Sequence, residues 1–193
     1  HSKERKKLLK DFGLNIYRPT RPGSFWVRTT ALGSYREVGR ACHLVTTNES
    51  RVMIDVGVNI ASDTDPMPYF TAPEALPMEK LDAVVLTHAH LDHAGMLPVL
   101  FRYGYRGPVY CTPPTRDLML LLQSYYLKVG GSEGKRAPYD MEDIRTCMRH
   151  VVDVDWGQTV DITPDVKLTF HNAGHILGSS SVHLHVGDGK HNI

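Results

Sequence analysis

The sequence predicts one α/β domain behind a short basic helix. Short stretches with the periodicity of strands alternate with longer helical stretches, a pattern typical of strands joined by crossover helices. The stretch Leu81–Thr87 contains four consecutive apolar residues, Ala83 to Leu86, as expected for a strand that is buried on both faces. With 193 residues, 41% of them hydrophobic, the chain is long enough to enclose one sizeable core.

Residues 1–23 predict a basic helix and a linker, and residues 24–193 the domain. Ser2 is a suitable N-cap for a helix that continues to about Phe12, and Gly13 would end it. Arg18–Gly23 contains two prolines and is typical of a linker. The helix is rich in cations: Lys3, Arg5, Lys6, Lys7 and Lys10. Such a run either contacts phosphates or, as the simpler interpretation, forms a solvated helix face.

The elements of the domain follow from periodicity and from turn residues. The expected strands are Phe25–Leu32, Cys42–Thr47, Arg51–Val56, Leu81–Thr87, Pro108–Cys111, Val151–Val154, Gln158–Ile162, Val166–His171 and Ser181–Val186. The expected helices are His93–Tyr103, Pro114–Val129 and Asp140–Arg149, with a proline-rich loop at 62–77 and a flexible connection at Gly130–Arg136. Gly187–Lys190 predicts a hairpin turn, after which residues 191–193 are too few for a return strand. We therefore expect the chain to stop inside an element.

Composition restricts the class of protein further. The formal net charge of +1 gives no argument for nucleic acid. The three cysteines are far apart and form no CxxC pair, which fits a reducing, cytoplasmic setting. No stretch approaches the roughly 18 apolar residues of a membrane span. We expect a cytoplasmic protein without a membrane segment.

The stretch Thr87–His93 contains the pattern HxHxDH at the end of the buried strand. Its three imidazoles and one carboxylate are ligand types that Zn²⁺ prefers. His88 and His90 share one face through the two-residue period of a strand, whereas Asp92 and His93 lie on the turn into a helix and can address a second ion. Single histidines are usually surface or core residues, but a cluster of this density predicts a metal site.

Two further residues are candidates for the same site. His175 lies in a loop between two strands and is flanked by Gly174 and Gly178, which allow the close backbone approach that metal loops require. Asp55 follows an apolar strand, where a carboxylate is costly to bury without partners. It either orients a ligating histidine or caps a turn at the strand end. Glu37, in the loop after the first strand, either lines the site or forms a surface salt bridge.

These motifs resemble the metallo-β-lactamase superfamily. Within it the chain looks most similar to the β-CASP nucleases, which include ribonuclease J, and to archaeal relatives of the endonuclease subunit of the cleavage and polyadenylation specificity factor. The resemblance covers about residue 25 to the end, and it rests on Ala31–Gly33, Glu37–Arg40, His88–Pro98, Pro113–Thr115 and Ala173–Ser179. The fold that it implies is an αββα sandwich, of which this chain would hold only the N-terminal part.

The resemblance also implies roles for the candidate residues. His88, His90 and His175 would bind the first zinc ion, Asp92 and His93 the second, and Asp55 would support the site from behind. Asp92 would also take part in catalysis. The bridging aspartate, the last zinc-binding histidine and the β-CASP domain would follow the end of this chain, so we expect it to hold at most one zinc ion firmly and to be inactive alone.

The implied activity is hydrolysis of RNA phosphodiester bonds in RNA 3′-end processing or degradation. A water molecule activated between two zinc ions would attack phosphorus. Cleavage would be endonucleolytic, with 5′-to-3′ trimming as a second mode, and the full-length protein could form a homodimer. Two alternatives stay open: a small-molecule metallohydrolase such as a glyoxalase II-like thioesterase, and a non-catalytic scaffold paralogue. The surroundings of Gly33 and Pro98 and the helical insert Pro114–Arg149 favour the nuclease, and the intact ligand positions argue against the scaffold.

Overall fold

The computed structural model describes residues 2–21, 23–62, 64–132, 137–187 and 189–193. Most of the connection expected at Gly130–Arg136 lies outside the described residues, as does Asp188 in the expected hairpin turn.

A mixed sheet of six strands forms the centre of the molecule, in the order β1-β2-β3-β4-β5-β6. Its strands are β1 (Val27–Ala31), β2 (His43–Thr47), β3 (Arg51–Ile54), β4 (Ala83–Val85), β5 (Val109–Cys111) and β6 (Val151–Asp153). The first three strands pair antiparallel, β1 and β2 across the loop at residues 32–42 and β2 and β3 across a short turn. Strands β3 to β6 are parallel because crossover segments connect them. The C-terminal ends of the parallel strands therefore lie along one edge.

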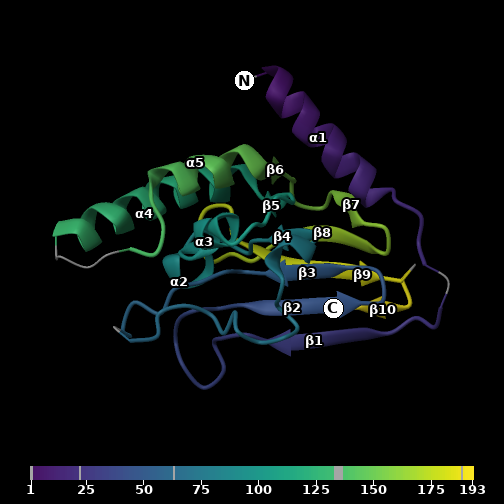
Figure 1. The fold of residues 1–193 in the computed structure, drawn as a ribbon, viewed down its shortest axis with the longest axis horizontal. Helices are drawn as coiled ribbons and strands as arrows, with labels where there is room; N and C mark the ends of the chain where they lie inside the picture. The colour runs from purple at the N-terminus through teal and green to yellow at the C-terminus, as the bar shows by residue number, and fades with distance from the viewer. Residues whose placement is uncertain (1, 22, 63, 133–136, 188) are drawn as a thin grey trace.

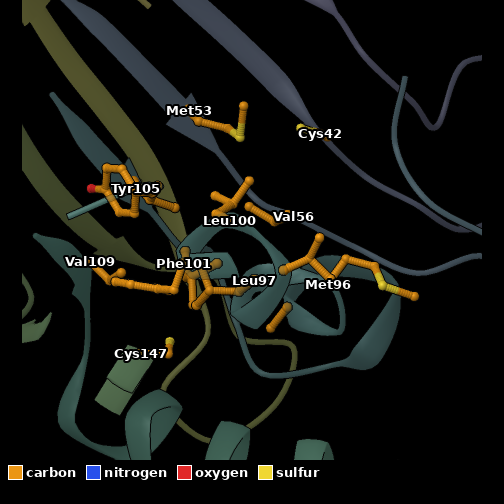
Figure 2. Packing of buried hydrophobic residues seen from close by; sticks show 14 of the residues in the cluster. Cys42, Met53, Val56, Met96, Leu97, Leu100, Phe101, Tyr105, Val109 and Cys147 are labelled. Atoms are coloured by element: carbon orange, nitrogen blue, oxygen red, sulfur yellow. The ribbon is translucent and has the colours of Figure 1, made fainter. Parts of the chain in front are cut away.

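Helices cover one face of this sheet (Figure 1). They are α2 (Leu91–Ala94), α3 (Leu97–Arg102), α4 (Pro113–Ser132) and α5 (Met141–His150), and a 3-10 turn, η1 (Met78–Lys80), precedes β4. Figure 2 shows the core between the two layers, where Leu100 and Phe101 of α3 lie between Met53 of the sheet and Cys147 of α5. None of the described helices has both the length and the apolar content needed to cross a bilayer.

A second sheet covers the other face of the first. It contains β7 (Thr159–Thr163), β8 (Val166–Asn172), β9 (Ser180–Val186) and β10 (His191–Asn192), in the order β10-β9-β8-β7. A second apolar cluster fills the space between the sheets, with Val52 and Val85 from the first and Phe170 and Leu184 from the second. The helices and the two sheets form three of the four layers of the predicted αββα sandwich. This confirms the predicted fold class for the N-terminal part of the sandwich.

Two boundaries expected within residues 24–193 were wrong. Residues 191–193 were considered too few for a return strand, yet His191 and Asn192 pair with Val186 and His185 as β10. The helix expected at His93–Tyr103 consists of two helices, because the Met96 N–H donates to the carbonyl of Val56 at 2.8 Å instead of to a carbonyl of α2. This hydrogen bond holds the break between α2 and α3 beside the end of β3.

The basic helix α1 (Ser2–Ile16) continues past Gly13, which was expected to end it. Its contacts with the domain extend the helix: the Phe12 ring is buried 5.9 Å from the ring of His150, and the Asn15 amide donates to Asp82 at 3.3 Å. These contacts offset the cost of a glycine inside the helix, roughly 1 kcal/mol. The Arg5 guanidinium also donates to the carbonyl of Val151 at 2.6 Å. The domain boundary at residues 23 and 24 stays a prediction.

Candidate metal centre

The HxHxDH stretch lies at the C-terminal edge of the parallel strands. β4 ends at Val85, His88 and His90 follow on a short loop, and Asp92 and His93 lie in the first turn of α2. His175 arrives from the loop between β8 and β9. The backbone N–H of Ser180, the first residue of β9, donates to the carbonyl of Thr87 at 2.9 Å and fixes the two loops side by side.

Three imidazoles converge on one point. The Nε2 atom of His88 lies 3.2 Å from Nδ1 of His90, and Nε2 of His175 lies 3.2 Å from the same Nδ1. The three ligand atoms all lie within 4.8 Å of one another, and among the described residues no other group of imidazole, thiol or carboxylate atoms does so. Three imidazole nitrogens this close together suit one Zn²⁺-like ion.

The protonation of His88 suits metal binding. The Thr87 hydroxyl donates its hydrogen to Asp55 at 2.8 Å, so at 2.9 Å from His88 it can only accept a hydrogen from Nδ1. Nδ1 therefore carries the proton, and Nε2 turns a lone pair toward His90. Burial and the neighbouring imidazoles lower the pKa of His88 to about 4, which keeps the ring neutral at pH 7.

Asp55 binds both parts of the site from beneath. Asp55 is buried, with 4% of its surface exposed. Its carboxylate accepts hydrogen bonds from the Thr87 N–H, the Thr87 hydroxyl and Nδ1 of His93, each at 2.8 Å. Its backbone is left-handed, with φ of 58°. Asp55 thus orients the imidazole of His93 and binds the backbone after β4, and its support of a metal-binding histidine stays a prediction.

His93 and Asp92 form a pair beside the three histidines. Burial lowers the pKa of His93, but the hydrogen bond and the charge of Asp55 outweigh it and raise this pKa overall. Because Nδ1 of His93 bonds to Asp55, its Nε2 atom faces Asp92, 3.6 Å from the carboxylate. The expected second pair of ligands is thus adjacent to the first group.

The loop that carries His175 is fixed by residues that the sequence analysis missed. The buried Ser179 hydroxyl accepts from the N–H groups of His175 and Ile176, each at 3.1 Å. The hydroxyls of Thr112 and Thr115 donate to the carbonyl of Gly178 at 2.7 and 3.0 Å. Small hydroxyl residues within or next to the motifs Pro113–Thr115 and Ala173–Ser179 were the available signal, but only the fold shows which backbone groups they bind.

Replacing Ser179 with alanine is expected to weaken zinc binding about 10- to 100-fold, because the His175 loop loses both bonds from its backbone and the imidazole is no longer held in place. The affinity is measured by competition with a chromophoric chelator. The exposed neighbouring serine provides the control, since Ser181→Ala is expected to leave zinc affinity unchanged. Equal affinities of the two variants would contradict a positioning role of Ser179.

The other polar candidates have structural partners. Glu37 binds Arg40 through both carboxylate oxygens, at 2.6 and 3.1 Å, so the salt-bridge interpretation is confirmed. The guanidinium of Arg40 also lies 2.6 Å from Asp65 and packs on the ring of Tyr69. The ring of His183 is tilted against that of His185 on β9, with 4.1 Å between the centroids, and neither belongs to the group of three converging imidazoles.

Comparison with known proteins agrees with this geometry. The family model described as the metallo-beta-lactamase superfamily domain matches residues 44–190. The chain is 54% identical over 191 residues to a protein of Methanosarcina mazei named transcription termination factor FttA, covering 99% of this chain and 30% of that protein. A protein of the same name from Methanocaldococcus jannaschii is 53% identical, with 98% and 30% covered. The chain thus spans about 30% of the length of these relatives.

Solved structures share the fold. A metallo-β-lactamase from Cronobacter sakazakii, a mutant of its HARLDQ motif, superposes with a TM-score of 0.56 at 22% identity, covering 89% of this chain and 62% of that chain. The Rm3 metallo-β-lactamase gives a TM-score of 0.51 at 22% identity, with 86% and 56% covered. The family resemblance expected from the motifs is therefore confirmed, and the chain belongs to the metallo-β-lactamase superfamily.

Proposed function

We propose that the protein that carries this chain is a zinc-dependent ribonuclease of the β-CASP type. The observation that carries the proposal is the convergence of three imidazole nitrogens, one of them with its tautomer fixed by the Asp55–Thr87 bonds. The relatives named transcription termination factor support a substrate of nucleic acid, and we propose nascent RNA, cut in the cytoplasm of an archaeal cell.

In this proposal His88, His90 and His175 bind the first zinc ion, and Asp92 and His93 contribute to a second. When bound, zinc supplies a Lewis acid for the phosphoryl oxygens and lowers the pKa of water toward neutrality. Asp55 keeps His93 in one tautomer, and the Thr87 hydroxyl does the same for His88. The side chain of Asp92 is 37% exposed and accepts a proton from the attacking water.

The test is cleavage of a 5′-labelled single-stranded RNA, both by this chain and by a protein of the relatives' length that contains it. We expect the longer protein to cut RNA in the presence of Zn²⁺. Asp92→Asn is expected to lower kcat about 10²- to 10⁴-fold, the usual contribution of a general base, with little change in KM. His183→Ala, which alters an imidazole outside the site, serves as the control and should retain full activity.

A thioester substrate in the same assay distinguishes the second candidate, a glyoxalase II-like thioesterase. Hydrolysis of the thioester without RNA cleavage would overturn the proposal in favour of that enzyme. Absence of both activities, with zinc bound, would favour the scaffold role.

A further inference from the structure

The outward face of α1 carries a continuous stripe of lysines that ends in an aromatic residue. The stripe contains Lys3, Lys6, Lys7, Lys10 and Tyr17, which follow one another at helical spacings and stay in register because the Tyr17 N–H donates to the carbonyl of Gly13 at 3.0 Å. All five side chains are exposed, with Tyr17 at 74%, although the Tyr17 hydroxyl donates to Asp161 of β7 at 3.4 Å. The stripe is roughly 20 Å long, from the rise of an α-helix.

The stability of the helix does not account for these charges. Lysines three and four residues apart on one face repel each other. Lys3 also lies in the first turn, where the helix dipole disfavours a cation. Within the described part of the chain no carboxylate forms an ion pair with any of the four lysines, whereas Arg18 and Arg40 both have such partners. The lysines are thus available for an anion from outside.

The opposite side of α1 attaches the helix rigidly to the domain. The Phe12 ring is buried against His150, Arg5 donates to the carbonyls of Arg149 and Val151, and Asn15 donates to Asp82. The stripe is therefore held in one orientation before any partner binds. With Phe12 buried in the domain, the large apolar side chains that α1 exposes are Leu9 and Leu14, fewer than the apolar face of a helix lying in a membrane contains.

The partner that fits is single-stranded nucleic acid. Regularly spaced cations beside an exposed aromatic ring are the combination that binds a phosphate backbone and stacks a base. A lipid surface could also use the lysines and the ring, and the vesicle assay below distinguishes it from RNA. Since the same chain carries a candidate phosphodiesterase centre, RNA is the relevant strand, and this choice rests on the proposed function.

The stripe lies far from the metal centre in the topology of the sheet. Asn15 contacts Asp82 just before β4 begins, and Arg5 contacts Val151 at the start of β6, so α1 lies along the N-terminal edge of the parallel strands. The three histidines lie beyond the C-terminal end of β4. In Figure 1 α1, drawn in purple, extends to one side, away from α2 and α3.

We infer that the lysine stripe of α1 and Tyr17 form a distal binding surface for single-stranded RNA, which anchors the strand while another part of it reaches the metal centre. An anchor of this kind contributes to affinity and to KM but leaves kcat unchanged.

The experiment compares two variants of equal charge. The stripe variant replaces Lys3, Lys6, Lys7 and Lys10 with glutamine. The control variant replaces four other exposed cations with glutamine: Arg28, Lys80, Lys128 and Lys190. Both change the net charge from +1 to −3. Glutamine keeps the helix propensity of lysine, and circular dichroism checks that α1 stays folded. Binding of a fluorescent 20-residue oligouridylate to chelator-treated protein is measured at several salt concentrations, so that cleavage does not interfere.

The measured quantity is the slope of the logarithm of the association constant against the logarithm of salt concentration. In the stripe variant we expect this slope to be smaller in magnitude by about 2.8, if each lysine neutralises one phosphate of a single strand. The control variant should keep the wild-type slope. Tyr17→Ala should weaken binding roughly 5- to 100-fold, from the usual strength of one base stack, whereas Tyr17→Phe should bind like the wild type.

Equal slopes for the stripe and control variants would overturn the inference. A second contradicting result would be a stripe variant that binds RNA as tightly as the wild type but no longer binds phosphatidylserine vesicles. This result would identify a lipid surface as the partner. Because binding is measured without metal, a protein that binds oligouridylate through the stripe but cuts no RNA would contradict the proposed function alone.

Discussion

Replacing Asp55 with alanine is expected to lower the free energy of unfolding by about 3–5 kcal/mol. The buried carboxylate accepts three hydrogen bonds, and its removal leaves the N–H and hydroxyl of Thr87 and the Nδ1–H of His93 without their acceptor. An unsatisfied buried donor costs about 1–3 kcal/mol. The change is measured by urea unfolding of the metal-free chain, so that loss of metal binding does not contribute.

Two comparisons make this expectation specific. In Asp55→Asn the amide oxygen can accept only part of these hydrogen bonds, and the NH₂ group faces other donors. We therefore expect an intermediate loss of unfolding free energy. Asp117→Ala removes a carboxylate that is 71% exposed and pairs only with its neighbour Arg116, and it should change stability by less than about 0.5 kcal/mol. Similar losses for Asp55→Ala and Asp117→Ala would show that the Asp55 bonds contribute little.

The second large effect is expected for His88→Ala, which should abolish tight zinc binding by the purified chain. The wild-type chain should retain about one zinc ion per molecule after dialysis, measured by elemental analysis. Loss of one of three converging imidazoles should weaken binding by more than the 10- to 100-fold that is typical of residues behind the ligands. His183→Ala, outside the group, should retain the ion.

Each alternative result has a definite meaning. Zinc retained in His88→Ala would place the ion at other residues and would contradict the assignment of the three histidines. A wild-type chain that binds no zinc, although folded, would mean that three imidazoles are not enough and that a carboxylate must complete even the first site.

The local part of the site could be predicted from the sequence. HxHxDH concentrates four ligand side chains within six residues after a buried strand, and the end of a parallel strand is where side chains on a loop can converge. The alternating and continuous apolar runs likewise predicted every strand of the two sheets except β10, mostly to within one or two residues. These features depend on neighbours in the sequence, so their physical causes are local.

Tertiary bonds determined the parts that could not be predicted. His175 lies 85 residues from His90, and its loop is brought to the others by tertiary bonds from Ser180 to Thr87 and from Thr112 and Thr115 to Gly178. The break between α2 and α3 depends on Met96 bonding to Val56, and the extension of α1 past Gly13 depends on Phe12 and Asn15 contacting the domain. No pattern within a single segment contains this information.

The origin of the three imidazoles has a consequence for folding. His88 and His90 follow a strand of the six-stranded sheet, whereas His175 joins two strands of the four-stranded sheet. An ion held by all three is a cross-link between the two halves of the sandwich, and the halves cannot separate without releasing it. Metal occupancy and unfolding are then one coupled equilibrium, in which a free zinc concentration 100 times the Kd adds about 2.7 kcal/mol to the stability of the chain.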